Sequence, residues 1–176
     1  MKIQLLITVI IITSHLISSD FNITRLKYQG GGDWYADKSS LPNLLKFISN
    51  ETDIKVGEKE IRASIGEKEF YDNQYYYITG HGNISFSDKE RDNLRESLTN
   101  GAFLHADDNY GMDQSFRKEM NAIFPDKDWV ALDPGHEIFN IFYKFPNGLP
   151  KIHEHDGKPP QALALFHNNK IIVLYT

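Results

Sequence analysis

The chain has 176 residues, a formal net charge of −5 and no cysteine. Hydrophobic residues make up 40% of it and charged residues 24%, which is ordinary for one globular domain with a substantial core. The absence of cysteine excludes disulfides, thiolate metal sites and a cysteine nucleophile. Acidic and basic residues are mixed without a basic stripe, so nucleic acid is not an expected partner.

The N-terminus is typical of a secretory signal peptide. Lys2 precedes the apolar run Ile3 to Ile12, and the small polar stretch Thr13 to Ser19 follows. The apolar run is too short to span a bilayer comfortably. We therefore expect residues 1–19 to be a signal cleaved near its end, and residues 20–176 to form a single exported domain without a transmembrane span. An uncleaved N-terminal anchor is the alternative.

The expected domain begins with alternating strand and helix patterns. Apolar and polar residues alternate from Phe21 to Tyr28, which predicts a strand that ends before three glycines. Ser39 or Ser40 is expected to cap the next helix, in which leucines recur at helical spacing. The further expectations are a short strand at Ile54 to Val56 and a loop from Gly57 to Asn73, with a short helix around Glu67 to Tyr71.

The strongest signals lie between Tyr75 and Gly111. The strand Tyr75 to Thr79 is followed at once by Gly80-His81-Gly82-Asn83, and the strand Ala102 to Ala106 by Asp107-Asp108-Asn109-Tyr110-Gly111. The intervening helix begins with capping-box spacing at Ser87 and Glu90 and is expected to end at Gly101. Two consecutive strands thus end in loops rich in acid, base and amide groups.

The rest of the chain predicts one helix and three strands. Asp113 is expected to cap the helix, which ends at Pro125. Trp129 to Leu132 predicts a short strand. The strands Ala162 to Phe166 and Ile171 to Tyr175 flank Asn168-Asn169, which is typical of a tight hairpin.

Strands that alternate with helices predict an α/β fold. The expected architecture is three-layer and flavodoxin-like, with a mostly parallel sheet, helices on both faces and a C-terminal hairpin. Right-handed crossovers place all strand-to-helix loops at one edge of the sheet. In the flavodoxin-like order the first and third strands are neighbours. Asp33 and His81 would then flank the point where the strand order reverses, with Asp107 and Asp108 one strand further on.

The candidate catalytic residues are His81, Asp107 and Asp108. Glycines on both sides of His81 let a ligand approach an imidazole that can act as a base or a metal ligand. Two adjacent carboxylates can bind a hard cation or share acid–base work. The alternative is structural, with His81 in a tight turn and the aspartates capping loop backbone.

The glycine-rich loop after the first strand is a candidate anion- or ligand-binding segment. Its backbone N–H groups can face a ligand, and its aromatic residues can line a pocket. The spacing matches neither the dinucleotide nor the Walker motif, and the chain has no serine-hydrolase elbow. The candidate ligand-binding residues are Gly31, Gly32, Asp33, Trp34, Gly80, Gly82, Asn83, Asn109 and Tyr110.

His153 and His155 are the candidate metal ligands. Residues two apart in an extended segment point the same way, and a carboxylate from another loop would complete a three-ligand site. A folded-back loop with hydrogen-bonded imidazoles is the alternative. The sequence establishes no cofactor, and a divalent metal is the one cofactor that these histidines can bind.

Several of these motifs resemble domain-of-unknown-function family 4159. They run through nearly all of the chain after the signal and include Thr24–Tyr28, Gly30–Tyr35, Thr79–Asn83, Ala106–Asp113 and Phe145–Gly157. The resemblance implies a class I glutamine-amidotransferase-like fold, a bacterial source and an envelope-associated, periplasmic setting. It implies no established reaction, and the amidotransferase cysteine is missing. His105 stands where the resemblance implies an apolar or aromatic residue. Similar proteins continue beyond this C-terminus, so we expect a shortened member.

The sequence leaves three functions open. The first is a noncatalytic module of the cell envelope that binds a small polar ligand or a partner protein. The second is a hydrolase in which His81 is the base and Asp107 or Asp108 orients it, with a metal at His153 and His155 as a variant. The third is a structural envelope component whose motif residues hold loops together.

Overall fold

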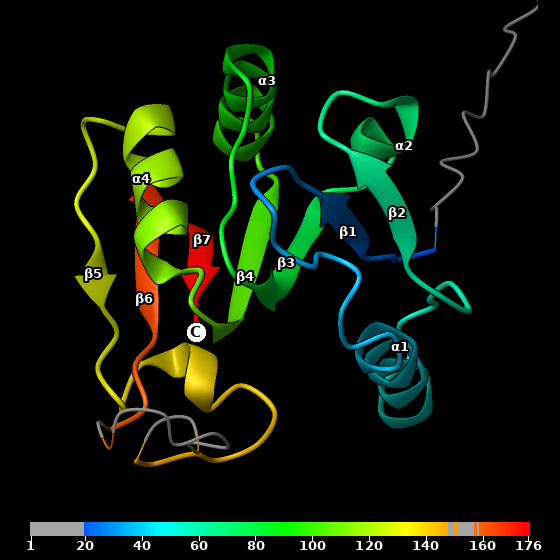
Figure 1. Ribbon diagram of the computed structural model, residues 1–176. Helices are drawn as coiled ribbons and strands as arrows, with labels where there is room; N and C mark the ends of the chain where they lie inside the picture. Colours follow the sequence, from blue (N-terminus) through cyan, green and yellow to red (C-terminus); the bar gives the residue numbers. More distant parts are fainter. Residues whose placement is uncertain (1–19, 148–149, 151–156, 158) are drawn as a thin grey trace, which may run out of the picture.

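The computed structural model describes residues 20–147, 150, 157 and 159–176. In this part of the chain, strands and helices alternate up to β5, as the sequence pattern indicates (Figure 1). The strands are β1 (Thr24–Lys27), β2 (Ile61–Ser64), β3 (Tyr75–His81), β4 (Phe103–Tyr110), β5 (Val130–Ala131), β6 (Leu163–His167) and β7 (Lys170–Tyr175). The helices are α1 (Ser40–Glu51), α2 (Lys68–Tyr71), α3 (Asp88–Thr99), α4 (Asp113–Ile123) and the 3-10 turn η1 (Glu137–Phe139).

The strands form one seven-stranded sheet in the order β2-β1-β3-β4-β7-β6-β5. Strands β2, β1, β3, β4 and β7 run parallel to one another, and β6 runs antiparallel to both β7 and β5. The first strand therefore lies between the second and the third, so the strand order reverses at β1 and β3. The expected α/β fold with a mostly parallel sheet is confirmed.

Helices cover both faces of the sheet. On one face, buried residues of α2, α3 and α4, such as Phe70, Leu98 and Met120, pack with Ile78 and Val173 of the strands. On the other face Leu41 and Leu45 of α1 pack against Ile23 and Tyr77, and Phe139 of η1 packs against Leu174. Figure 1 shows α2, α3 and α4 in the upper half of the view, with α1 and the segment around η1 below.

The predicted capping box of α3 is present. The Ser87 side chain accepts the Glu90 backbone N–H, and the Glu90 carboxylate accepts the Ser87 N–H at 2.8 Å. The helix ends as expected before Gly101, whose φ of +110° only glycine adopts without strain.

The C-terminal hairpin between β6 and β7 is also confirmed. Asn168 and Asn169 have φ values of 49° and 61°, so both residues of its turn lie in the left-handed region. Asparagine tolerates this conformation, which matches the twist of the flanking strands. Through this hairpin β7 enters the interior of the sheet, between β4 and β6.

Several local expectations were wrong. Asp107, Asp108 and Asn109 belong to β4 rather than to a loop after it, and the expected loop from Gly57 to Asn73 contains β2. Ser39 precedes α1 without a side-chain capping bond. The second strand is Ile61–Ser64 rather than Ile54 to Val56, because Val56 forms only an isolated bridge with Phe21. The true strand buries only Ala63 fully, so its apolar pattern is weak. The residue before α4 is Met112, whose N–H is capped by the Asp108 carboxylate at 3.1 Å and 3.2 Å rather than by Asp113.

Candidate functional site

The loop after β1 is joined to the loop after β3 by backbone hydrogen bonds. The N–H of Gly32 donates to the Asn83 carbonyl at 2.9 Å, and the N–H of Asp33 donates to the His81 carbonyl at 3.2 Å. A Cβ on Gly80 would lie 2.3 Å from the Tyr28 hydroxyl and 2.9 Å from the Asp33 carboxylate. The glycines therefore permit this close approach, which carries Asp33 to the carboxyl end of β3.

Asp33 and His81 form an exposed polar pair at this edge. The backbone N–H of His81 donates to the Asp33 carboxylate at 2.5 Å, and His81 Nδ1 lies 3.2 Å from Asp33 Oδ2. About 56% of the His81 side chain and 35% of the Asp33 side chain are exposed. Because an ionised carboxylate only accepts hydrogen bonds, the Nδ1 atom carries the proton and Nε2 remains available to a ligand.

The hydrogen bonds also change the acidity of Asp33. The backbone N–H of His81 holds the pKa of the Asp33 carboxyl below its ordinary value, and the His81 side chain adds to this effect. Asp33 is therefore ionised at neutral pH, as its role toward His81 requires.

Asp107 and Asp108 point to opposite faces of the sheet. Both belong to β4, where successive side chains alternate between faces. Asp107 accepts the Tyr77 hydroxyl at 2.7 Å on the α1 face, whereas Asp108 accepts the Tyr175 hydroxyl at 2.7 Å and caps α4 on the other face. The two carboxylates therefore do not form one pair, and each is tied to a tyrosine of a neighbouring strand.

The α1 face of β4 carries a row of polar groups that begins with His105. Its ring lies edge-on to Tyr77, with centroids 5.4 Å apart, and its Nε2 lies 3.1 Å from the Thr176 hydroxyl. Burial lowers the pKa of His105, although the nearby Asp107 charge opposes this. Burial and Asp107 together raise the pKa of Tyr77. His105 thus places a neutral imidazole beside Asp107.

Asp37 and Arg25 belong to the site, and sequence reasoning missed both. The Asp37 carboxylate accepts a hydrogen bond from the side-chain amide of Asn109 at the end of β4. Asp37 has a φ of 50°, which is uncommon for a residue with a side chain. The buried Arg25 donates to the Asp37 carbonyl at 3.1 Å. A charged residue at an inward position of the β1 alternation was the signal that could have revealed Arg25.

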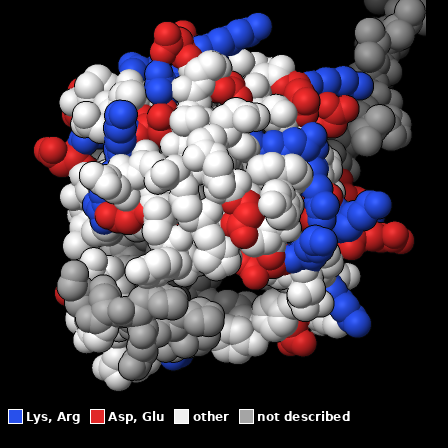
Figure 2. Space-filling model, viewed as in Figure 1, with Lys and Arg blue, Asp and Glu red and all other residues white. Residues whose placement is uncertain are grey.

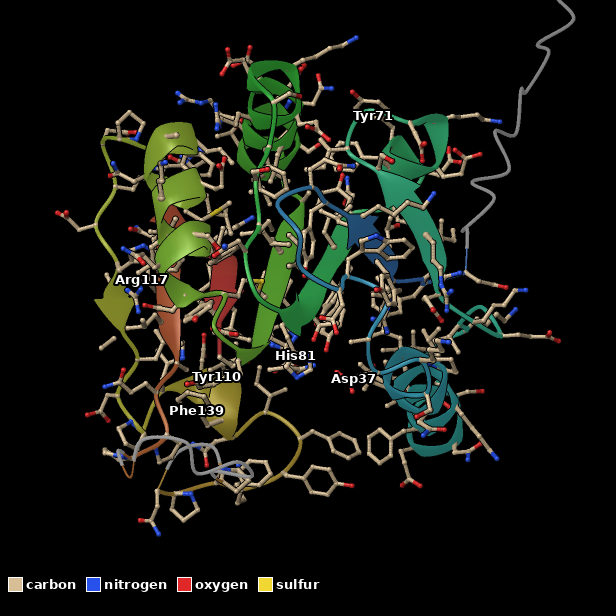
Figure 3. All side chains as sticks on the ribbon, viewed as in Figure 1. Asp37, Tyr71, His81, Tyr110, Arg117 and Phe139 are labelled. Carbon is tan, nitrogen blue, oxygen red and sulfur yellow. The ribbon has the colours of Figure 1, made fainter. Side chains whose placement is uncertain are left out.

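An aromatic contact joins α1 to the segment after η1. Phe47 of α1 packs against Phe142 and Tyr143, with both centroid distances at 6.1 Å. Figure 2 shows a hollow in the lower half of this face, with acidic side chains beside it. In Figure 3, Asp37, His81 and Tyr110 lie in a row across the lower ends of the parallel strands, with Phe139 below Tyr110.

The other candidate ligand-binding residues lie in different environments. Trp34 packs partly against the main core, and Gly31 has open space where a Cβ would lie. The N–H of Gly82 donates to the Tyr110 carbonyl at 3.1 Å, which joins the loop after β3 to the end of β4. The structure therefore gathers the β1, β3 and β4 loops at one edge.

The candidate metal ligands His153 and His155 lie outside the described residues. Within residues 20–147, 150, 157 and 159–176, no three histidine, aspartate or glutamate side chains are grouped to hold a metal ion. Asp33 and His81 are a pair without a third such ligand in that part of the chain.

A separate hollow of about 910 Å³ lies at the opposite edge of the sheet, at the amino ends of β1 and β3. Phe21, Ile54, Tyr71 and Tyr75 form its apolar lining, together with acidic and amide side chains. No ion pair of the described residues involves the charged groups of this lining. The candidate site is therefore assigned to the carboxyl edge, where the titratable groups are paired and oriented.

The fold and this edge define an α/β domain with a polar site at the carboxyl ends of parallel strands. The model of the family described as domain of unknown function (DUF4159) matches residues 22–176, so the chain belongs to that family. No curated protein matches the chain. None of the helices in the described part is long and apolar enough to cross a membrane.

Proposed function

We propose that this protein is a noncatalytic module of the bacterial cell envelope that binds a small polar ligand at the carboxyl edge of its sheet. The observation that carries the proposal is the exposed and oriented pair of His81 and Asp33 where the strand order reverses. Ligands of open α/β sheets bind at such reversal points. The carboxylates of Asp107 and Asp108, in contrast, are occupied by hydrogen bonds within the protein.

The export and the finer fold family are part of the same proposal. The N-terminal apolar segment supports secretion. The strand order β2-β1-β3-β4-β7 supports a flavodoxin-like domain of the glutamine-amidotransferase-like kind. The chain has no cysteine for the amidotransferase reaction, which supports a binding role over that reaction.

The test is a binding screen with the purified chain and a panel of sugars, amino acids, diamines and dicarboxylates. We expect at least one class to raise the melting temperature, because a ligand that binds only the folded state stabilises it. His81→Ala and Asp33→Asn should weaken this ligand at least tenfold, which is about 1.4 kcal/mol of binding free energy. His167→Ala, on β6, is the matched control and should bind normally.

Two results would contradict the binding proposal. One is a ligand that binds His81→Ala and Asp33→Asn as tightly as the unchanged chain. The other is a loss of about 2 kcal/mol or more of stability in His81→Ala with no change in binding, which would support the structural role of the motif.

A hydrolase is the second candidate, and the contact between His81 Nδ1 and Asp33 favours it. A base held by a carboxylate is one half of a nucleophilic or water-activating arrangement. In this version Asp33 orients His81, while Asp107 or Asp108 remains the alternative orienting group. A metal at His153 and His155 is the assisted variant.

The hydrolase proposal is tested with nitrophenyl esters, phosphates and glycosides, with and without added zinc or magnesium. Turnover that falls at least about 10²-fold in His81→Ala, but not in His167→Ala, would support it. Turnover unaffected by His81→Ala would exclude His81 as the base.

A further inference from the structure

Arg25 of β1 is almost completely buried, with only 1% of its surface exposed. Its guanidinium donates to three carbonyls of one short segment, those of Trp34 at 3.3 Å, Ala36 at 2.7 Å and Asp37 at 3.1 Å. It also donates to the Ser40 hydroxyl at 3.3 Å and lies over the Tyr77 ring. The fork of the guanidinium thus holds the segment that links the glycine loop to α1.

The buried Glu60 carboxylate pairs with this charge but takes no hydrogen bond from it among the described residues. The Glu60 carboxylate lies 3.8 Å from Arg25 Nε, yet that Nε makes no hydrogen bond among the described residues. Glu60 instead accepts two hydrogen bonds from Arg62, at 2.9 Å and 2.7 Å. Burial of a guanidinium is costly, so an apolar side chain would serve packing better. The directed bonds of Arg25 all go to residues 34–40.

Two site carboxylates belong to this part of the chain, Asp33 just before the segment and Asp37 within it. Asp33 contacts His81, and Asp37 accepts the Asn109 side-chain amide. The left-handed backbone of Asp37, with a φ of 50°, is unfavourable for an aspartate and must be held by its surroundings. Arg25 and the Ser40 hydroxyl both donate to the Asp37 carbonyl, at 3.1 Å and 2.9 Å.

We propose that Arg25 is a positioning residue of the site. It fixes the backbone of Asp37 relative to Asp33, so that the Asp37 carboxylate accepts the hydrogen bond from the Asn109 side-chain amide. The inference rests on the proposed function, because it takes Asp33 and Asp37 as groups that face the ligand. Lysine cannot replace this role, since a single ammonium group lacks the planar fork that reaches several carbonyls at once.

The test uses NMR spectra of the full chain without ligand, so it does not depend on whether a ligand is found. In folded Arg25→Met, we expect the side-chain amide signals of Asn109 to shift to the positions that they have in Asp37→Ala. The backbone N–H signal of His81, which reports the bond to Asp33, should keep its position. Arg25→Lys should show the same loss at Asn109.

Arg62→Met is the matched control, because Arg62 shares Glu60 but binds no carbonyl of the segment. It should leave the Asn109 signals in place. Unchanged Asn109 signals in folded Arg25→Met, or an equal shift in Arg62→Met, would overturn the proposal. Asn109 signals at their unchanged positions in Arg25→Lys would overturn the proposal as well, because a positive charge alone would then hold Asp37 in place. Failure of both Arg25 variants to fold would show a role in the whole fold and would also overturn it.

Discussion

Asp33 accepts the backbone N–H of His81 at 2.5 Å and lies 3.2 Å from the Nδ1 atom of the same residue. One carboxylate thus fixes both the backbone and the imidazole of His81. This relationship links the loop after β1 to the end of β3 and orients an exposed imidazole at the carboxyl edge.

Replacement of this carboxylate should have a pH-dependent cost. The pKa of Asp33 is held below its ordinary value by His81, so its charge stabilises the fold above about pH 4. That stabilisation is lost as the pH falls through the folded-state pKa. Asp33→Asn should therefore cost about 1 kcal/mol at pH 7, a small value because the group is partly exposed, and much less near pH 2.

Urea unfolding at both pH values measures this difference. Asp92→Asn, which changes an exposed aspartate of α3, is the control and should cost little at either pH. A cost of Asp33→Asn that is equal at pH 7 and pH 2 would contradict the role of its charge.

Two glycines of the edge should respond differently to alanine. Gly80 has a φ of +142°, and its Cβ would meet the Tyr28 hydroxyl at 2.3 Å. Gly31 has a φ of +93° and open space around it. Gly80→Ala should cost roughly 3 kcal/mol through clash and strain, whereas Gly31→Ala should cost about 1 kcal/mol through strain alone. Equal costs in chemical unfolding would show that the close approach to Tyr28 is unimportant.

The bond between Tyr175 and Asp108 should be a measurable part of stability. Tyr175→Phe removes the hydroxyl that donates to Asp108 at 2.7 Å and leaves the ring packed on Phe116. We expect a loss of about 1.5 kcal/mol, the usual range for a hydrogen bond to a charged group. Tyr71→Phe, at an exposed position, should cost much less when both are compared by thermal unfolding. The reverse ranking would refute this assignment.

Two serines at helix starts should also differ in how much stability is lost when each is replaced by alanine. Ser87 caps α3 with its side chain, whereas Ser39 precedes α1 without a side-chain capping bond. Ser87→Ala should cost about 1 kcal/mol and Ser39→Ala only a few tenths, as measured by urea unfolding. A larger loss in Ser39→Ala would mean that α1 depends on a cap that the geometry does not contain.

Local and repetitive features were readable from the sequence by itself. The capping box at Ser87, the stop at Gly101 and the turn at Asn168-Asn169 depend on neighbouring residues, so their patterns carry the information directly. The alternation of strands and helices predicted the α/β sheet. Chirality and strand order then predicted that Asp33 and His81 would flank the point where the strand order reverses.

Only the tertiary structure decided which polar groups act together. Asp107 and Asp108 are adjacent in sequence, but strand alternation and the packing of Tyr77 and Tyr175 send them to opposite faces. Asp37 joins the site because Arg25 holds its backbone, a contact between residues 12 positions apart. Such choices depend on which surfaces are brought together by the fold, and no local pattern encodes that information.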